Sequence, residues 1–356
     1  MNEIVGIGAN VYDTLITTPF YPIEDTKLRA THVKECGGGP CATGLVASSK
    51  LGASAAYIGA LAKDSGGEFL LADMKRFGVS TDFVDMVEGK SSFSSYIVLS
   101  EESASRTCVF NKANLPNFEI DEKKADAIRS AQVLMVDGNE LDNAVKGAKI
   151  AKESGTKVLY DAGGLYEGIE KLLPYSDILI PSEEFALGHT GADNAEDAAK
   201  ILFEKYKPEI VVITQGKKGG IIFDGEKVEK YPAFLVDAVD SNGSGDVFHG
   251  AFAFCVTMGY NYYKACVVSS AVADSSLEYP TLYPKTGWTE QNPDDWFNAA
   301  CGNIKNAPIV AAMLRTGLCA DCTMLEADGD FTYKTLDFFI VLWYIKYKEG
   351  YHILNM

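Results

Sequence analysis

The residues best suited to chemistry lie together in one segment, Asp240 to Phe254, whose sequence is DSNGSGDVFHGAFAF. Apolar side chains recur at helical spacing in its second half, and this pattern predicts a helix that begins near Ser244. Gly243, Ser244 and Gly245 would then lie at the helix N-terminus, where backbone N–H groups and the helix dipole favour an anion. The two glycines also let a ligand approach the backbone closely. The segment therefore predicts an anion site.

Asp246 falls in the first turn of this predicted helix, beside the anion site. A carboxylate in that place suits a general base, which takes a proton from a hydroxyl group while the amides stabilise a phosphoryl group in transfer. The structural alternative is a glycine turn followed by an acid that stabilises the helix dipole. This segment alone does not decide between the two interpretations.

Two further glycine-rich segments could bind a ligand through the backbone. In CGGGPCATGLVASSKLG, Cys36 to Gly52, Gly38 and Gly39 precede a predicted helix and could bring a hydroxylated ligand to backbone amides. This segment lacks the Lys-Ser/Thr ending of a P-loop. TQGKKGG, Thr214 to Gly220, follows an apolar strand and could wrap a nucleotide phosphate or ribose. Each segment also fits an ordinary tight turn.

Three other patterns carry less information. GIGANVYD near the N-terminus lacks the third glycine of a dinucleotide fingerprint, because Val11 occupies that position, and this excludes a Rossmann NAD site. Cys319 and Cys322 form a CxxC pair without the further ligands that a zinc site needs. His249 follows Asp246 by one helical turn and is a weaker candidate for contact with a ligand.

Composition restricts the partners of the chain. Among its 356 residues, 49 acidic and 32 basic side chains give a formal net charge of −17. Such a surface repels nucleic acid and anionic membrane, so neither is expected as a partner. The apolar run from Phe338 to Ile345 is far shorter than the roughly 20 residues of a membrane span. Eight cysteines without framework spacing indicate reduced thiols and a cytoplasmic protein.

Short apolar runs alternate with amphipathic stretches over most of the chain. This alternation predicts βαβ units, and therefore an α/β fold with a mostly parallel sheet covered on both faces. Helices are predicted at Asn143–Glu153 and Ala195–Tyr206. The expected strands are Ile4–Ile7, Ala55–Ile58, Tyr96–Leu99, Val133–Val136, Val158–Tyr160, Ile178–Ile180, Ile210–Thr214 and Gly220–Phe223.

Two stretches interrupt this alternation. Thr14 to Lys34 and Ser91 to Lys112 are rich in Ser and Thr and alternate polar with apolar residues. They predict antiparallel strands that stand apart from the main sheet as a small lid. After about residue 285 the strand–helix alternation fades. We therefore expect one domain over residues 1–285, followed by a segment, 286–356, of uncertain correspondence.

In their order along the chain, these segments resemble the ribokinase-like (PfkB) family of carbohydrate kinases, from Met1 to about Tyr283. The acid that binds substrate hydroxyls in the family corresponds to Asp13 in GIGANVYD. Asp64 and Gly67 in YIGALAKDSGGEFL match the family's Gly…Asp-x-x-Gly element. The resemblance implies a three-layer fold with helices on both faces of the sheet and a small β-sheet lid. It makes Asp246 the catalytic base.

Three departures from the family pattern are visible. Thr43 stands where the family usually has Asn, and the Asn-x-x-Glu motif for magnesium and phosphate falls at Ser182 to Phe185 without its usual pair. Glu183 or Glu184 would then supply the carboxylate, through a water molecule. The third departure is the tail, which does not follow the closing helices of the family. The combination of GGPCAT, VDG, SEEFA and GDVFHGAFA resembles the sub-branch that includes sulfofructose kinase.

The resemblance implies a kinase that uses ATP and Mg²⁺ to phosphorylate a hydroxyl group, expected to be a hydroxymethyl group, of a small sugar. The lid of such kinases often forms a dimer interface, so a homodimer is expected. The implied anion hole is Gly243, Ser244 and Gly245; the implied substrate-binding residues are Asp13, Gly38, Gly39 and Thr43, with Asp137 as a further candidate; and the implied ATP-binding residues are Thr214, Gly216 and Gly219.

Two alternatives stay open. The first is a nucleoside kinase of the same fold, which an aromatic side chain stacking on the base, such as Phe93 or Tyr96, would favour. The second is a catalytically silent sugar-binding or regulatory protein. The altered Ser182–Phe185 segment makes the silent protein plausible, whereas the presence of Asp246 argues against it.

Overall fold

The computed structural model describes residues 2–103, 105–234, 243–274, 282–285 and 288–290. Contacts divide the chain into two units, Met1–Glu278 and Tyr279–Met356. In the second unit, β14 (Leu282–Lys285) and β15 (Trp288–Glu290) form an antiparallel pair. The CxxC pair and most of the predicted 286–356 segment lie outside the described residues.

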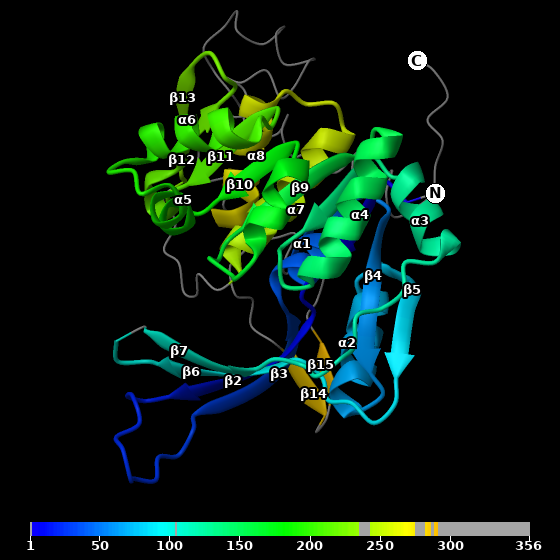
Figure 1. Ribbon diagram of the computed structural model, residues 1–356. Coiled ribbons are helices and arrows are strands. Elements are labelled where there is room, and N and C mark those ends of the chain that lie inside the picture. Colours follow the sequence, from blue (N-terminus) through cyan, green and yellow to red (C-terminus); the bar gives the residue numbers. More distant parts are fainter. Residues whose placement is uncertain (1, 104, 235–242, 275–281, 286–287, 291–356) are drawn as a thin grey trace, which may run out of the picture. The chain divides into compact units, whose positions relative to one another are not determined.

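A nine-stranded sheet forms the centre of the first unit (Figure 1). Its strands from β5 to β11 in the spatial order are parallel, and β12 and β13 continue the sheet antiparallel. The inner strands are continuous apolar runs that are buried on both faces, as expected for a covered parallel sheet. The spatial order is β13 (Val228–Tyr231), β12 (Gly220–Phe223), β11 (Ile210–Thr214), β10 (Ile178–Pro181), β9 (Lys157–Ala162), β8 (Val133–Val136), β1 (Ile4–Ile7), β4 (Ala55–Ala62) and β5 (Ser80–Val87).

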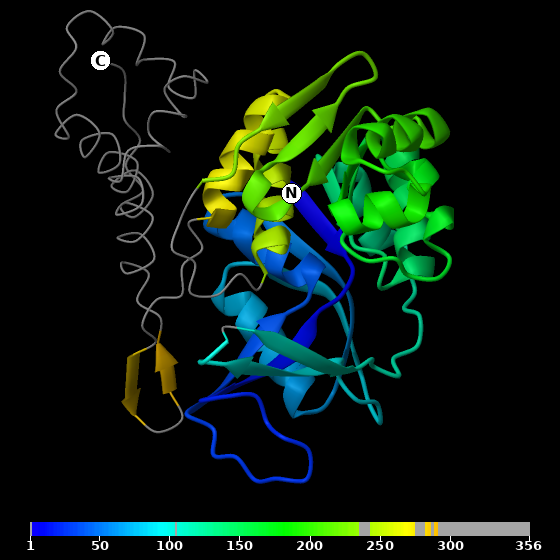
Figure 2. The ribbon, with the colours of Figure 1, turned by 90° about the vertical axis from the view of Figure 1, so that its left-hand side faces the viewer.

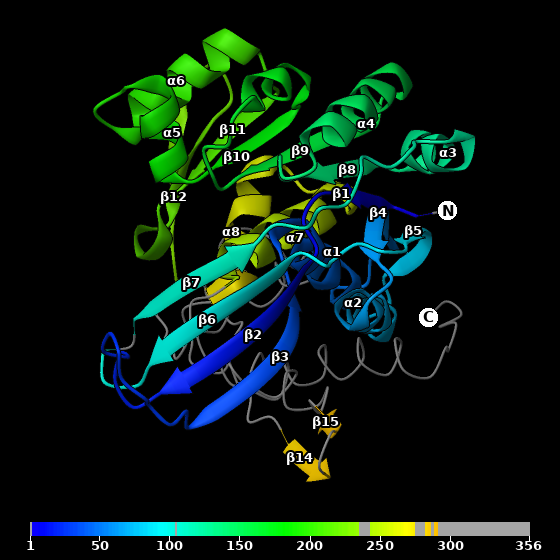
Figure 3. The same cartoon turned by 60° about the horizontal axis from the view of Figure 1, so that its bottom comes forward.

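Helices cover both faces of this sheet and complete the three-layer α/β fold (Figures 2 and 3). Helices α1, α2, α7 and α8 lie on one face, and α3, α4, α5 and α6 lie on the other. The bounds are α1 (Pro40–Lys50), α2 (Ser65–Arg76), α3 (Glu122–Ser130), α4 (Leu141–Ser154), α5 (Glu183–Thr190), α6 (Ala195–Tyr206), α7 (Ser244–Thr257) and α8 (Tyr262–Asp274), with 3-10 turns at η1 (Ile169–Lys171), η2 (Leu173–Tyr175) and η3 (Gly216–Lys218).

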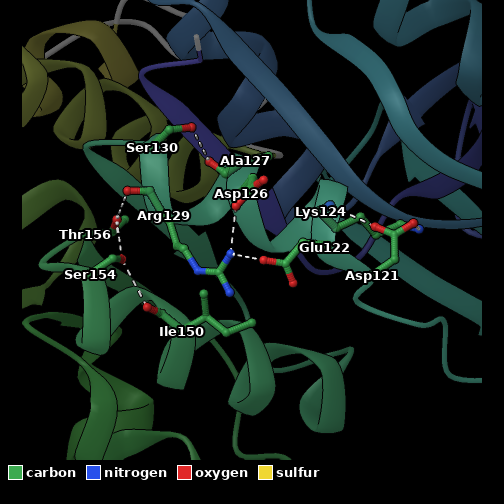
Figure 4. A network of polar contacts seen from close by, with 10 residues as sticks. All are labelled: Asp121, Glu122, Lys124, Asp126, Ala127, Arg129, Ser130, Ile150, Ser154 and Thr156. Atoms are coloured by element: carbon green, nitrogen blue, oxygen red, sulfur yellow. Dashed lines mark hydrogen bonds and ion pairs between the residues drawn. The ribbon is translucent and has the colours of Figure 1, made fainter.

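Polar contacts join α3 to the residues that follow α4 (Figure 4). The Thr156 hydroxyl donates to the carbonyl oxygens of Ile128 and Ala131, at 2.9 and 3.1 Å. Arg129 donates to Glu122 at 2.6 Å and pairs with Asp126 of the same helix. Because these ion pairs are exposed, they add little to stability. The buried hydrogen bonds of the Thr156 hydroxyl contribute more to holding α3 in place.

Four strands form a separate small sheet in the order β3-β2-β6-β7. It contains the predicted lid strands, but its central pair, β2 and β6, is parallel rather than antiparallel. The physical reason is that β2 follows β1 and β6 follows β5, so both leave the same edge of the parallel main sheet in one direction. The bounds are β2 (Val11–Thr18), β3 (His32–Gly38), β6 (Ser94–Ser100) and β7 (Arg106–Asn111).

The predicted elements of the main sheet are largely present. Strands β1, β8, β11 and β12 and helix α6 have the predicted bounds. Strands β5 and β13 were missed, because edge strands are only partly buried and show no continuous apolar run. Within the described residues, no helix has the length and apolar character needed to span a membrane.

Candidate active site

The start of helix α7 has the backbone of an anion site. The helix begins at Ser244, as the sequence predicts, and Gly243, whose φ is +75°, forms no side-chain cap within the described residues. Gly245 is exposed, and a Cβ built on it would meet no atom within 4 Å. Because the first N–H groups of a helix have no acceptor within it, this turn offers amides to a bound anion.

Asp246 lies in that first turn, and its pKa is raised. Burial, and then the charge of Asp161, raise the pKa of Asp246 from 3.8 to about 8, while His249 acts in the opposite direction. A carboxyl group with a pKa near the working pH is suited to accept a proton in a transition state. A Cβ built on Gly243 would lie 3.8 Å from Asp246 Oδ2 and 3.7 Å from Thr43 Cγ2, so these three residues are neighbours.

Backbone contact between α1 and α7 holds Thr43 and Asp246 close together. A Cβ on Gly250 would lie 2.1 Å from the carbonyl oxygen of Gly44, so the two helices touch through their glycines. The Ser48 hydroxyl bonds to the carbonyl oxygens of both glycines at 2.9 Å. This glycine pair was not predicted, although a small residue inside each of the two predicted helices was a usable signal for it.

Asp13 and the glycines before α1 form a second group. The Asp13 carboxylate is 8% exposed and accepts a hydrogen bond of 2.6 Å from the Ser95 hydroxyl. A Cβ on Gly38 would lie 1.9 Å from Asp13 Oδ2, so only glycine fits beside the carboxylate. Gly39 caps α1 with φ +92°. Burial raises the pKa of Asp13, and its charge contributes to the raised pKa of Asp246.

Asp137 is held by the backbone instead of facing an open space. It is 2% exposed, and its oxygens accept hydrogen bonds from the N–H groups of Ala9, Cys41 and Asn139, at 2.8, 3.0 and 2.9 Å. These contacts fix the loop after β1 and the start of α1. They favour a structural role for Asp137 over contact with a substrate.

The predicted nucleotide segment forms a turn between β11 and β12. Gly216 has φ +54° and is exposed, and a Cβ there would meet no atom within 4 Å. Gly219 is buried, and a Cβ there would lie 2.1 Å from the carbonyl oxygen of Tyr231, so backbone packing requires this glycine. Thr214 is half-buried at the end of β11 and forms a β-bridge with Ser182.

Glu183 connects the start of α5 to this turn. Its Oε1 accepts a hydrogen bond of 2.7 Å from the Gln215 amide, and its Oε2 lies 4.0 Å from Lys218 Nζ. Glu184 is exposed in the same first turn. In the described part of the chain, no three His, Cys, Asp or Glu side chains gather as a metal site. A magnesium ion held mainly by phosphate oxygens and water needs no such group, and one carboxylate near the nucleotide turn fits it.

Comparison with known proteins identifies the family. The model of the pfkB family carbohydrate kinases matches residues 1–285. The chain belongs to this family. It is 31% identical to the ribokinase of Mus musculus over 261 residues, which cover 70% of this chain and 80% of the relative. It is 27% identical to a 5-dehydro-2-deoxygluconokinase of Shouchella clausii over 309 residues, covering 79% of this chain and 93% of the relative.

A solved structure confirms the ribokinase-like fold of this kinase. The Arabidopsis thaliana ribokinase, complexed with ribose and ATP, matches with a TM-score of 0.71 and 21% identity, over 84% of this chain and 98% of its own. The prediction of a carbohydrate kinase of ribokinase-like fold is therefore confirmed.

Within the kinase, the predicted residues fall into distinct groups. One group is Thr43, Gly243 and Asp246, and the other is Asp13 and Gly38. The charge of Asp13 contributes to the raised pKa of Asp246 and so connects the two groups. Asp161 and Ser95 were missed, although a charged residue near the end of the buried strand KVLYDA was a usable signal for Asp161.

The aromatic candidates for base stacking differ in position. Strand register places Tyr96 on the face of the small sheet opposite Asp13, because Asp13 pairs with Ser95 and Tyr96 is the next residue. The Phe93 ring lies 6.0 Å from that of Phe110, which pairs with Ser95 on the Asp13 face.

Proposed function

We propose that this kinase transfers the γ-phosphoryl group of ATP to a hydroxymethyl group of a small sugar. The observation that carries the proposal is the position of Asp246, a carboxyl group of raised pKa in the first turn of α7. A base for a hydroxyl group and amides for a phosphoryl group are the two elements that this transfer needs.

In the proposed reaction, the ionised Asp246 takes the proton of the acceptor hydroxyl. The hydroxyl oxygen forms a bond to the γ-phosphorus, and the bond from that phosphorus to the β–γ bridging oxygen breaks, so ADP leaves. The amides at Gly243, Ser244 and Gly245 stabilise the charge of the phosphoryl group in transfer. Closure of the small sheet as a lid would exclude water and so limit ATP hydrolysis.

Asp13, Gly38, Gly39 and Thr43 are the proposed contacts of the sugar hydroxyls. A carboxylate that already accepts from Ser95 has free lone pairs for a further hydroxyl. Two relatives are named for ribose and for 5-dehydro-2-deoxygluconate, which supports a small sugar or sugar acid as acceptor. The resemblance of GGPCAT and GDVFHGAFA to the sulfofructose kinase sub-branch supports a ketose within that class.

ATP is proposed to lie over the turn that follows β11, near Thr214, Gly216 and Gly219. The open backbone at Gly216 supports this position. Magnesium, when bound, would neutralise phosphate charge, and Glu183 or Glu184 would hold it through water. The cytoplasm is the proposed compartment, because eight cysteines without framework spacing are typical of reduced thiols.

Replacing the two α5 acids tests the magnesium site. Glu183→Gln is expected to raise the magnesium concentration for half-maximal rate about tenfold, because a neutral amide binds the hydrated ion less tightly. Glu184→Gln is measured beside it, with Glu196→Gln, a first-turn acid of α6, as the matched control. If neither α5 variant changes the magnesium requirement, both carboxylates are excluded from this role.

A homodimer through the small sheet is the proposed assembly. Strand pairing puts Thr14, Tyr96 and Val109 in one row on the face opposite Asp13, and Tyr96 and Val109 are 52% and 63% exposed. Val33, on the same face, is 59% exposed. An exposed apolar face of this kind is suited to bury itself against a second copy.

Sedimentation of the purified kinase tests this assembly. The unaltered kinase is expected to sediment as a dimer, and Tyr96→Glu as a monomer, because the dimer would bury an unpaired charge. Ile201→Glu, at an exposed apolar position of α6, should stay dimeric. A monomeric unaltered protein, or a dimeric Tyr96→Glu variant, would contradict the proposal.

A coupled ADP-release screen tests the function itself. ATP turnover is measured with ketoses, pentoses, sugar acids and nucleosides, and the proposal expects release that depends on a sugar. Release that depends only on nucleosides would identify a nucleoside kinase instead. No release with any acceptor would favour a silent sugar-binding protein.

A further inference from the structure

A histidine is buried directly beneath the turn that begins α7. His249 is 4% exposed, and its two ring nitrogens each face a backbone carbonyl oxygen. Nδ1 lies 2.6 Å from the oxygen of Gly245, and Nε2 lies 3.1 Å from the oxygen of Ile180, on β10. A carbonyl oxygen only accepts, so each nitrogen must carry a proton to bond there. A neutral imidazole carries only one such proton.

Asp161 supplies the negative charge that a doubly protonated ring needs. It is the residue before the last in β9, is 5% exposed, and its Oδ2 lies 3.1 Å from His249 Nδ1. Apart from this contact, Oδ2 has no hydrogen-bond partner in the described part of the chain. Burial, and then the charge of Asp137, raise the pKa of Asp161 well above its usual value, so its ionised form needs an opposite charge close by. A cationic His249 supplies that charge at this distance.

Two effects act on the ring in opposite directions. Burial is the larger effect and by itself leaves the pKa of His249 below its ordinary value, whereas the carbonyls of Ile180 and Gly245 and the nearby carboxylates act to raise it. We give the contacts more weight than burial, because either neutral form would place a lone pair against a carbonyl oxygen. A deprotonated Nδ1 would face the oxygen of Gly245 at 2.6 Å, and a deprotonated Nε2 would face that of Ile180 at 3.1 Å. The charged groups shown to act at this place are carboxylates. Asp246 on α7 and Asp137 after β8 act on the ring, Asp161 on β9 lies against its Nδ1, and Asp13 on β2 acts on Asp246. Cys41 on α1 and Tyr166 after β9 lie near the same carboxylates.

We infer that His249 carries a proton on both ring nitrogens, pairs with Asp161, and acts as a positioning residue that joins the first turn of α7 to the end of β10. It touches no reacting atom. It orients the Gly245 peptide that helps to receive the phosphoryl group, and its charge favours the ionised form of Asp246. This inference rests on the proposed kinase reaction for its effect on rate, but the state of the ring can be tested without it.

The ring state is tested by ¹⁵N NMR of the histidine side chains in the full-length protein. The chain has four histidines, so the His249 signals are assigned by their loss in His249→Asn. At pH 7, both His249 nitrogens are expected to be protonated in the unaltered protein. In Asp161→Asn, the ring is expected to lose one proton, because its counter-ion is gone. An unprotonated His249 nitrogen in the unaltered protein overturns the inference.

The pH profile of kcat/KM tests the effect on Asp246. His249→Asn can keep the bond to Gly245, and His249→Gln can keep the bond to Ile180, but both remove the positive charge. In both variants the acidic limb is expected to move to higher pH by about one unit, because an opposite charge near Asp246 is lost. His189→Gln, which removes a partner of Tyr206 on the opposite face of the sheet, should leave the limb unmoved.

The outcomes distinguish a failure of the positioning role of His249 from a failure of the proposed kinase function. An acidic limb that stays in place in both His249 variants, while the unaltered enzyme is active, overturns the positioning role, since a merely structural histidine would lower the rate at every pH equally. No phosphorylation by the unaltered enzyme with any sugar overturns the proposed function, while the NMR measurement still decides the state of the ring.

Discussion

Asp246→Asn is expected to lower kcat by about 10²–10⁴-fold, the range that a general base contributes. Asparagine has nearly the same shape but cannot accept the proton of the acceptor hydroxyl. The dissociation constant of ATP should change little, because the amides that start α7 remain. The measurements are steady-state kcat with an acceptor found in the ADP-release screen and calorimetric titration of ATP. Near-normal phosphorylation by this variant would show that another group is the base.

Asp197→Asn is the matched control for that variant. Asp197 also lies in the first turn of a helix, α6, where it accepts a hydrogen bond from Asn194. Its replacement removes the same charge from the same kind of position. Because α6 carries no proposed site residue, kcat should stay within a factor of about two. A loss as large as that of Asp246→Asn would indicate a general effect of charge instead of a base.

The stability of Asp246→Asn relative to the unaltered protein should depend on pH in a definite direction. The pKa of Asp246 is raised from 3.8 to about 8 in the folded state, so between these values the folded protein holds a proton that the unfolded chain has lost. The free energy of unfolding therefore falls progressively as the pH rises from about 4 to 8, because the unfolded chain is ionised there and the folded protein is not. The variant, which has no such cost, should gain melting temperature over the unaltered protein across this window and not below it. Equal melting temperatures at pH 8 would contradict the raised pKa.

Gly250→Ala is expected to destabilise the protein although alanine favours helices. The new Cβ would meet the carbonyl oxygen of Gly44 at 2.1 Å, so α1 and α7 must move apart. Overpacking of this kind costs about 1–3 kcal/mol, more than the gain of about 1 kcal/mol in helix propensity. Because Thr43 and Asp246 lie on these helices, kcat should also fall. Thermal unfolding and kcat are measured on the same preparation.

Gly188→Ala is the matched control for the crossing. Gly188 also lies within a helix, α5, but its new Cβ would meet only the end of the Leu165 side chain, which can turn away. This variant is expected to be as stable as the unaltered protein or slightly more stable. If Gly250→Ala proves equally harmless, the α1–α7 contact does not hold the site together.

The local features of the site could be predicted from the sequence because each depends on residues that are neighbours along the chain. The glycines before Asp246 and the apolar spacing after it predicted the start of α7 at Ser244. The strand of residues Ile4–Ile7 was predicted for the same reason, since a buried parallel strand is a continuous apolar run.

The features that were missed depend on contacts between distant segments. The parallel pairing of β2 and β6 follows from the direction in which both strands leave the main sheet, which no local pattern records. The pairing of His249 with Asp161 joins residues 88 positions apart, and the inward position of Asp137 depends on amides from two other segments. Residue types alone placed Asp137 among the substrate contacts, whereas its hydrogen bonds favour a structural role.

A crystal structure of the kinase with an accepted sugar and a non-hydrolysable ATP analogue tests the central claim most directly. The reactive hydroxyl oxygen is predicted to lie within about 2.6–3.2 Å of an Asp246 carboxylate oxygen, with the terminal phosphate on the amides of Gly243 to Gly245. A hydroxyl that meets another acid, or a terminal phosphate bound away from the start of α7, would contradict the account.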